Sequence, residues 1–280
     1  MLAALIGIAI LLVSTDAAAH GASHSHKRAP YLALGDSVTF GFEESEVRPP
    51  PDYEDAASFH AYPEFVGDAL HLRTRNAACP GETTSSFIDP NAPSNGCENV
   101  YPNSSGGYRT AFPLHVSYEG SQLSFAIKFL KSHPRTTLVT LMIGANYLFL
   151  CQRTTDDGCA SERQATLATV TDNVHRILAA IRKKAKYDGR IVLISYYSLA
   201  YTNQTVNDTV QGLNAAIDAG AKGLRITRAA GFGEFASGSD HSGGSACAAG
   251  LLTQLDTGGC GVHPSYAGQS LLALAVERAL

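Results

Sequence analysis

Two patterns of apolar residues alternate along the chain. Short runs of mostly apolar residues cover positions 31–34, 137–143 and 191–195. Such runs, bounded by turn-forming residues, are typical of strands that are buried on both faces. We also expect short strands at 74–77 and 224–227.

Longer segments carry apolar residues three and four positions apart, which is the spacing of one helix face. One such stripe consists of Leu123, Ala126, Ile127 and Leu130, and it follows Ser121, a residue suited to cap a helix. Because strands and helices alternate, we expect a parallel sheet with helices on both faces. The helices are predicted at 63–72, 121–133, 162–186, 206–221 and 265–280.

Three stretches show neither pattern. Residues 44–55 are acidic and contain three consecutive prolines, which is typical of a surface loop. Residues 85–118 are rich in Ser, Pro, Asn and Gly, and residues 231–261 are rich in Gly and Ser. Loops as long as 85–118 are usually functional, so this stretch is a candidate for shaping a binding site.

The first residues of the chain predict an export signal. Residues 2–13 form an apolar run that is too short to cross a bilayer comfortably, and the alanines at 17–19 suit a cleavage site. We therefore expect a signal peptide at 1–19, a disordered leader at 20–29 and one domain at 30–280. A retained membrane anchor is the alternative.

Composition and charge are those of an ordinary globular protein. With 45% hydrophobic and 16% charged residues, the chain can bury a sizeable core. Its formal net charge of −4 provides no field that would attract nucleic acid. We expect a monomer that has no nucleic-acid partner and no stable membrane insertion once the signal is cleaved.

Export changes the interpretation of the six cysteines, because an even number in an exported protein indicates disulfides. Six cysteines allow fifteen pairings, but these six fall in three separate neighbourhoods. Sequential pairing is therefore the simplest expectation, and each bond would contribute roughly 2–4 kcal/mol. A zinc site is the alternative, although the cysteines show no CxxC spacing. The expected pairs are Cys79 with Cys97, Cys151 with Cys159 and Cys247 with Cys260.

Ser37 is the candidate nucleophile of the chain. It follows the predicted strand 31–34 in the triplet Gly35-Asp36-Ser37, and α/β folds bind their ligands at the carboxyl ends of parallel strands. An ordinary turn uses the same residue types, so the triplet decides nothing alone.

A serine nucleophile requires a general base. His263 is preferred among the ten histidines because it stands just before the last predicted helix, where Pro264 constrains the chain direction. The pair formed by Asp240 and His241 is the rival.

Acyl transfer also requires donors for the oxyanion. Three candidates stand at predicted strand ends: the backbone N–H of Ser37, the backbone N–H of Gly81 and the side-chain amide of Asn146. Glycine lets the backbone approach a ligand closely. Each of these residues is common in turns, so it is their joint occurrence at one sheet edge that favours catalysis.

These residues stand in blocks that resemble those of the SGNH, or GDSL-type, serine hydrolases, particularly exported actinobacterial-like lipases and esterases with three disulfides. The blocks are 35–37, 76–83, 143–146 and 263–264. The resemblance implies a three-layer, flavodoxin-like α/β fold with a central parallel sheet of about five strands. It also implies that no metal or organic cofactor is needed. The implied roles are Ser37 as nucleophile, His263 as base, and Ser37, Gly81 and Asn146 as the oxyanion hole.

Two positions depart from the family pattern. Tyr147 stands where the third block usually has Asp, which leaves the Asn146 donor in place. Cys260 and Gly261 stand where the family usually has its catalytic Asp, two or three residues before the histidine.

The partner of the His263 ring therefore stays open between a backbone carbonyl and Asp256. A carbonyl accepts the ring N–H but lacks the charge that stabilises the imidazolium.

The function that follows is a secreted carboxylic-ester hydrolase acting on a small-molecule or lipid ester, with acyl and lipid esters expected first. Removal of acetyl groups from a carbohydrate is the first alternative, because the same residues serve it. A non-catalytic binding module that kept the fold and lost the acid is the second.

Overall fold

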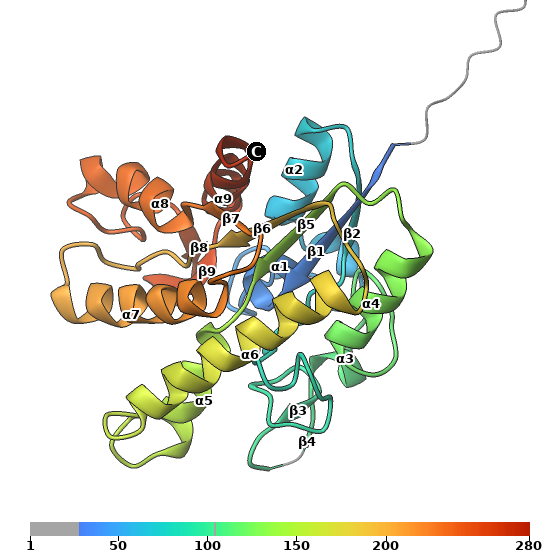
Figure 1. Cartoon of the computed structure of the whole chain (residues 1–280). Helices are drawn as coiled ribbons and strands as arrows, with labels where there is room; N and C mark the ends of the chain where they lie inside the picture. Colours follow the sequence, from blue (N-terminus) through green and yellow to red (C-terminus); the bar gives the residue numbers. More distant parts are fainter. Residues whose placement is uncertain (1–27, 104) are drawn as a thin grey trace, which may run out of the picture.

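The computed structural model describes residues 28–103 and 105–280 (Figure 1). Its centre is a sheet in the order β2-β1-β5-β6-β7, in which every neighbouring pair of strands is parallel. This arrangement confirms the predicted parallel sheet of about five strands. The strands are β1 (Pro30–Gly35), β2 (Arg73–Asn76), β5 (Leu138–Met142), β6 (Arg190–Ile194) and β7 (Thr227–Ala229).

Helices cover both faces of the sheet, so the fold has three layers (Figure 1). On one face lie α4 (Gln122–Ser132), α6 (Arg163–Lys183) and α7 (Gln204–Gly220). On the other face α2 (Tyr62–Ala69) packs against α9 (Tyr266–Arg278). β2 lies on one side of β1 and β5 lies on the other, so the direction in which successive strands are added across the sheet reverses after β2. Right-handed crossovers place the helices before and after such a reversal on opposite faces of the sheet.

The central strands form the core. All residues of β1 and β5 are buried, whereas Arg73 and Arg75 of the edge strand β2 are exposed. This difference explains why the central strands were detectable as continuous apolar runs and β2 was only weakly signalled.

The stretch 231–261, expected to be irregular, contains a helix and a hairpin. The helix is α8 (Gly231–Ser239), and the hairpin pairs β8 (Leu252–Gln254) with β9 (Cys260–Pro264). Its Gly/Ser-rich composition concealed these elements, because tertiary packing overrides weak local propensity. Phe235 of α8 is fully buried, for example.

Other differences from the predicted elements are smaller. A helix, α5 (Ala145–Thr154), follows β5 at a place where no helix was predicted. The last strand of the sheet, β7, begins three residues later than predicted. The remaining short elements are α1 (Ser37–Phe40), α3 (Tyr108–Ala111), β3 (Asn99–Val100), β4 (Ser105–Gly106) and 3₁₀ helices at Ala56–Ser58 and Asp240–Ser242.

All three expected disulfides are present, which confirms the sequential pairing. Among the residues that the structure describes, no helix is long and apolar enough to cross a membrane. The predicted signal peptide at 1–19 and most of the predicted leader lie outside the described residues.

The core of β5 provides a test of stability. Leu141 is fully buried in this central strand, so Leu141→Ala should lower the free energy of unfolding by about 2–5 kcal/mol. Leu70, at the exposed end of α2, is 37% exposed. Leu70→Ala should therefore change the free energy of unfolding by less than about 1 kcal/mol. Urea unfolding of both variants measures the difference, and equal losses would contradict the assignment of β5 to the core.

Candidate active site

The carboxyl ends of the parallel strands bring the predicted site residues to one edge of the sheet. Ser37 follows β1, Gly81 lies beyond β2 and Asn146 follows β5. His263 comes from β9 in the C-terminal hairpin. Ser37, Asn146 and His263 line one cavity of about 380 Å³.

A sharp turn presents Ser37. This residue begins α1, a single helical turn, and Asp36 caps that turn by accepting the N–H of Val38 at 3.1 Å. Gly35 has a φ of +152°, and a Cβ at this position would lie 2.3 Å from the carbonyl oxygen of Met142. Only glycine therefore allows the chain to turn this closely against β5.

The side chain of Gln122 holds the same turn from α4. Its Oε1 accepts from the N–H of Gly35 at 2.7 Å, and its Nε2 donates to the carbonyl of Gly35 at 3.0 Å. The pairing of β2 with β1 has already ended at Asn76. The amide of Gln122 therefore supplies hydrogen bonds that β2 does not make to Gly35.

Asp36 is fully buried beside Ser37. Burial raises the pKa of Asp36 to about 6, although hydrogen bonds from the hydroxyl of Tyr196 and the N–H of Val38 act in the opposite direction. Both oxygens of Asp36 are thus engaged in holding the turn, and neither contacts His263.

His263 lies within hydrogen-bond reach of Ser37. The distance from His263 Nε2 to Ser37 Oγ is 3.0 Å, and the ring of Phe42 packs against the imidazole with centroids 5.0 Å apart. The rival pair, Asp240 and His241, lies in a 3₁₀ helix outside the lining of this cavity. The structure therefore brings the preferred pair together and leaves the rival apart.

The other ring nitrogen of His263 meets a carboxylate that the sequence did not single out. Glu44 Oε1 lies 2.8 Å from His263 Nδ1 and also accepts the N–H of Val262 at 2.9 Å, while the hydroxyl of Thr253 donates to Oε2 at 2.6 Å. Burial raises the pKa of Glu44, but the hydrogen bond and charge of His263, together with the Thr253 bond, outweigh it and lower the pKa to about 2. Glu44 is therefore an ionised partner of the imidazole.

This geometry corrects the expectation that Asp256 or a backbone carbonyl orients His263. Asp256 pairs instead with Arg48 at 2.5 Å, and a carboxylate rather than a carbonyl faces Nδ1. Glu44 lies 219 positions before His263 in the chain, so a search limited to the residues near the histidine could not find it.

Gly261 creates the space that Glu44 occupies. A Cβ at Gly261 would lie 2.1 Å from Glu44 Oε1. Gly261 is also one of the two positions where the family resemblance implied an Asp. A glycine at that position, together with a carboxylate in the acidic loop that follows Ser37, was the available signal.

Three hydrogen-bond donors remain at the edge of the sheet. Gly81 has a φ of +82°, and a Cβ there would lie 2.7 Å from the carbonyl oxygen of Asn95. Within residues 28–103 and 105–280, the backbone N–H groups of Ser37 and Gly81 donate to no other protein group. Asn146 is the second residue of α5, and its Oδ1 accepts from Asn95 Nδ2 at 2.8 Å, which leaves its own NH₂ group for a ligand.

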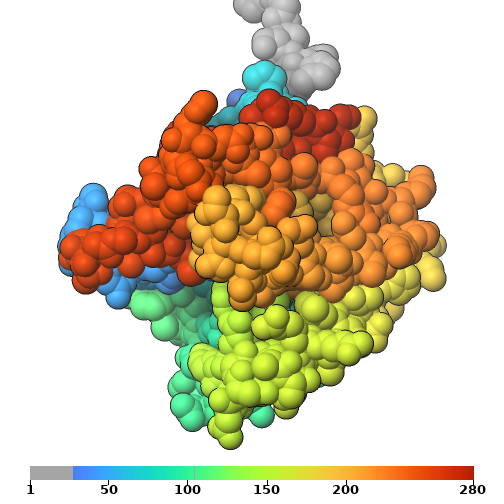
Figure 2. Space-filling model, turned by 90° about the vertical axis from the view of Figure 1, so that its left-hand side faces the viewer, coloured from blue at the N-terminus to red at the C-terminus, as the bar shows by residue number. Residues whose placement is uncertain are grey.

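The cavity extends from Ser37 between α5 and α7. Figure 2 shows this side of the molecule, with the yellow-green segment of α5 below the orange segment of α7. Apolar side chains dominate the lining, and Arg163 and Gln152 are among its few polar members away from Ser37. The main apolar side chains are Leu148, Phe149, Leu199, Val206, Val210 and Leu213.

Residues 33–271 match the model of the GDSL-like lipase/acylhydrolase family. The chain therefore belongs to this family of ester hydrolases. The match covers the nucleophile turn, α5 and β9, which supply Ser37, Asn146 and His263. No curated protein matches the chain by sequence.

Solved structures with a similar fold include an acetylxylan esterase and a phospholipase. An acetylxylan esterase from Geobacillus stearothermophilus is 15% identical with a TM-score of 0.54, and the alignment covers 90% of this chain and 94% of that one. Phospholipase A1 from Streptomyces albidoflavus is 18% identical with a TM-score of 0.56, and the alignment covers 90% of this chain and 100% of that one. At such identities the likeness establishes the fold.

Removing the charge of Glu44 tests its part in the site. Glu44→Gln keeps the shape but places a neutral amide at Nδ1, so kcat for an ester should fall by as much as about 10⁴-fold, as it does when the acid of a serine triad is amidated. Asp256→Asn is the matched control and should stay within a few-fold of the unaltered chain. Steady-state kinetics of both variants decide, and an unaffected Glu44→Gln would rule out the charge of Glu44 as a contributor.

The space at Gly261 allows a second test, in which the acid is moved. Gly261 lies outside the left-handed region, so its backbone accepts a side chain once Glu44 is shortened. Glu44→Ala should lose most activity, and adding Gly261→Asp should restore at least tenfold in kcat by returning a carboxylate to the ring. Gly261→Asp alone should destabilise the protein, because its side chain collides with Glu44. If the double variant has no higher kcat than Glu44→Ala, a carboxylate at position 261 cannot take the place of Glu44.

Proposed function

We propose that this chain is a secreted carboxylic-ester hydrolase that forms an acyl-enzyme on Ser37. The observation that carries the proposal is the row of contacts from Ser37 Oγ to His263 Nε2 at 3.0 Å and from His263 Nδ1 to Glu44 Oε1 at 2.8 Å. A nucleophile, a base and a charged group that orients the base are the three parts that serine-based acyl transfer requires.

The geometry supports a two-step reaction. Ser37 Oγ attacks the ester carbonyl carbon while His263 Nε2 takes the hydroxyl proton, and Glu44 stabilises the imidazolium that results. The carbonyl oxygen, now negatively charged, accepts hydrogen bonds from Ser37 N, Gly81 N and Asn146 Nδ2. His263 then protonates the departing alcohol, and water repeats the sequence to release the acid and regenerate Ser37.

The size and character of the cavity favour acyl chains longer than acetyl. A volume of about 380 Å³ lies in the range of pockets that hold drug-sized ligands, far more than a methyl group occupies. Its apolar walls on α5 and α7 would bury methylene groups, each favourable by about 0.8 kcal/mol. We therefore place lipid and longer acyl esters before acetylated carbohydrates as substrates.

The disulfides support the secreted part of the proposal. Bonds such as Cys79–Cys97 form and persist in oxidising compartments and are rare in the cytosol. Residues 1–19 have the pattern of a signal peptide, and N-terminal sequencing of exported protein would locate the cleavage.

Turnover of a series of acyl esters tests the reaction. The purified chain should hydrolyse p-nitrophenyl esters with kcat/KM rising from acetyl to medium and long chains, and Ser37→Ala should abolish the activity. Acetylated xylan is assayed in parallel. Higher kcat/KM for acetyl groups would favour the carbohydrate esterase, and a folded, disulfide-bonded chain inert on every ester would favour the binding module.

A substitution in the cavity wall tests where the acyl chain lies. Val206 of α7 lines the cavity, and Val206→Trp would fill part of it. The variant should lose at least tenfold in kcat/KM for long-chain esters while acetyl ester turnover stays within about threefold. Val206→Ala is the matched control and should retain long-chain activity. Equal loss on acetyl and long-chain esters would place the acyl chain elsewhere.

A further inference from the structure

Asn95 makes contacts with both elements that carry the proposed oxyanion donors beyond Ser37. Its backbone N–H donates to the carbonyl of Gly81 at 2.8 Å. Its side-chain Nδ2 donates to Asn146 Oδ1 at 2.8 Å. Asn95 lies in the long excursion between β2 and α4, so one residue links the loop after β2 to the helix after β5.

The side-chain bond decides which end of the Asn146 amide faces the cavity. A carboxamide has one oxygen, which accepts, and one NH₂ group, which donates. Because Asn95 occupies the oxygen, the NH₂ group of Asn146 is the end left for the substrate. If Asn95 offered an acceptor instead, Asn146 would turn its NH₂ group toward Asn95 and present its oxygen to the developing negative charge.

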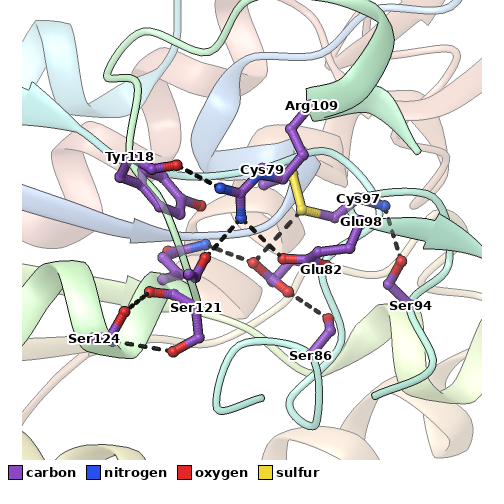
Figure 3. Close-up of polar contacts among 12 residues, drawn as sticks. Cys79, Glu82, Ser86, Ser94, Cys97, Glu98, Arg109, Tyr118, Ser121 and Ser124 are labelled. Carbon is purple, nitrogen blue, oxygen red and sulfur yellow. Dashed lines mark hydrogen bonds and ion pairs between the residues drawn. A yellow bond between two sulfur atoms is a disulfide. The ribbon is translucent and has the colours of Figure 1, made fainter. Parts of the chain in front are cut away.

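The segment around Asn95 is held firmly enough to impose this choice. The disulfide Cys79–Cys97 ties it to the loop of Gly81, and the hydroxyl of Ser94 accepts the N–H of Cys97 at 3.1 Å. Glu82, next to Gly81, is fully buried against this disulfide and accepts from the hydroxyl of Ser86 (Figure 3). It also accepts from Nε2 of Gln122.

The same network explains a cluster that resembles a metal site. Cys79, Cys97 and Glu82 offer ligand atoms close together, but both sulfurs are joined in the disulfide, whereas metals bind thiolates. Burial and the nearby charge of Glu98 raise the pKa of Glu82 well above its usual range. Glu98 is paired in turn with Arg109 at 3.3 Å. The three residues of the cluster therefore stabilise the segment that carries Asn95.

We propose that Asn95 is a positioning residue that orients the Asn146 amide so that its NH₂ group stabilises the oxyanion. The inference rests on the proposed ester hydrolysis and adds a residue to it. Asn95 acts through Asn146 and does not touch the substrate.

Two substitutions at Asn95 give the expected signature. Asn95→Ala removes the donor and frees the Asn146 amide to rotate, so kcat should fall roughly tenfold with KM little changed. Asn95→Asp is isosteric but offers only acceptors, so the Asn146 amide should turn over. We expect kcat to fall about 10²–10³-fold, which is the effect of losing an oxyanion donor. A purely structural role predicts the opposite order, because the isosteric variant would disturb packing less.

A double-mutant cycle with Asn146→Ala separates orientation from the charge that Asp adds near the site. In the Asn146→Ala background, Asn95→Ala should change kcat by less than twofold. In the same background, Asn95→Asp and Asn95→Ala should have equal kcat. Independent, multiplying losses would overturn the proposal, as would an Asn95→Asp variant as active as Asn95→Ala. Should Asn95→Asp fail to fold, the cycle with alanine alone still decides.

The reaction with a fluorophosphonate keeps the two proposals distinguishable. Labelling of Ser37 in the unaltered chain, found by mass spectrometry, shows that the nucleophile is competent, and its rate should fall in the Asn95 variants in parallel with kcat. Unaltered protein that neither labels nor turns over esters would overturn the proposed function and, with it, the role of Asn95. Normal labelling and turnover in both Asn95 variants would overturn the role of Asn95 alone. Urea unfolding midpoints near that of the unaltered chain serve as the control for folding.

Discussion

The contact between Glu44 and His263 is the interaction on which the arrangement of the site depends. It joins the loop after the first strand to the C-terminal hairpin, and it is possible only because Gly261 has no side chain to fill the space. Glu44 also accepts bonds from Val262 and Thr253 of the same hairpin. One ionised carboxylate thus sets the orientation of the imidazole and holds together two segments from opposite ends of the chain.

A loop can place a carboxylate this accurately only if the loop itself is packed. A second, smaller hydrophobic cluster provides that support beside the main core, with Phe40, Phe59 and Tyr108 buried within it. Tyr53 packs onto this cluster, and its hydroxyl donates to the carbonyl of Glu43 at 2.7 Å. The neighbouring Phe42 contacts both the cluster and the ring of His263. The acidic loop is therefore anchored at Phe42 and Glu43, directly before Glu44.

The oxyanion side of the site is organised on the same principle. The sheet provides the ends of β1 and β5, while the irregular excursion that includes Asn95 supplies the contacts that fix Gly81 and Asn146 relative to each other. A disulfide and a buried polar network stabilise this excursion where regular secondary structure is sparse. A rigid scaffold carrying well-braced loops is a general way to build a site, because loops tolerate the unusual backbone geometry that close approach to a ligand requires.

The sequence by itself determined the parallel sheet, the disulfide pairing and the residues that meet at the cavity, because each leaves a local signal. Continuous apolar runs mark buried strands, and short spacings between cysteines make sequential pairing the simplest choice. Ser37 and Asn146 lie directly after such runs, and His263 stands beside the last helix. The helix α8 and the β8–β9 hairpin escaped detection because their stability comes from burial of residues such as Phe235 rather than from local propensity. Only the tertiary structure decided the partner of His263, since Glu44 lies 219 positions away and is selected by contacts that no local pattern encodes.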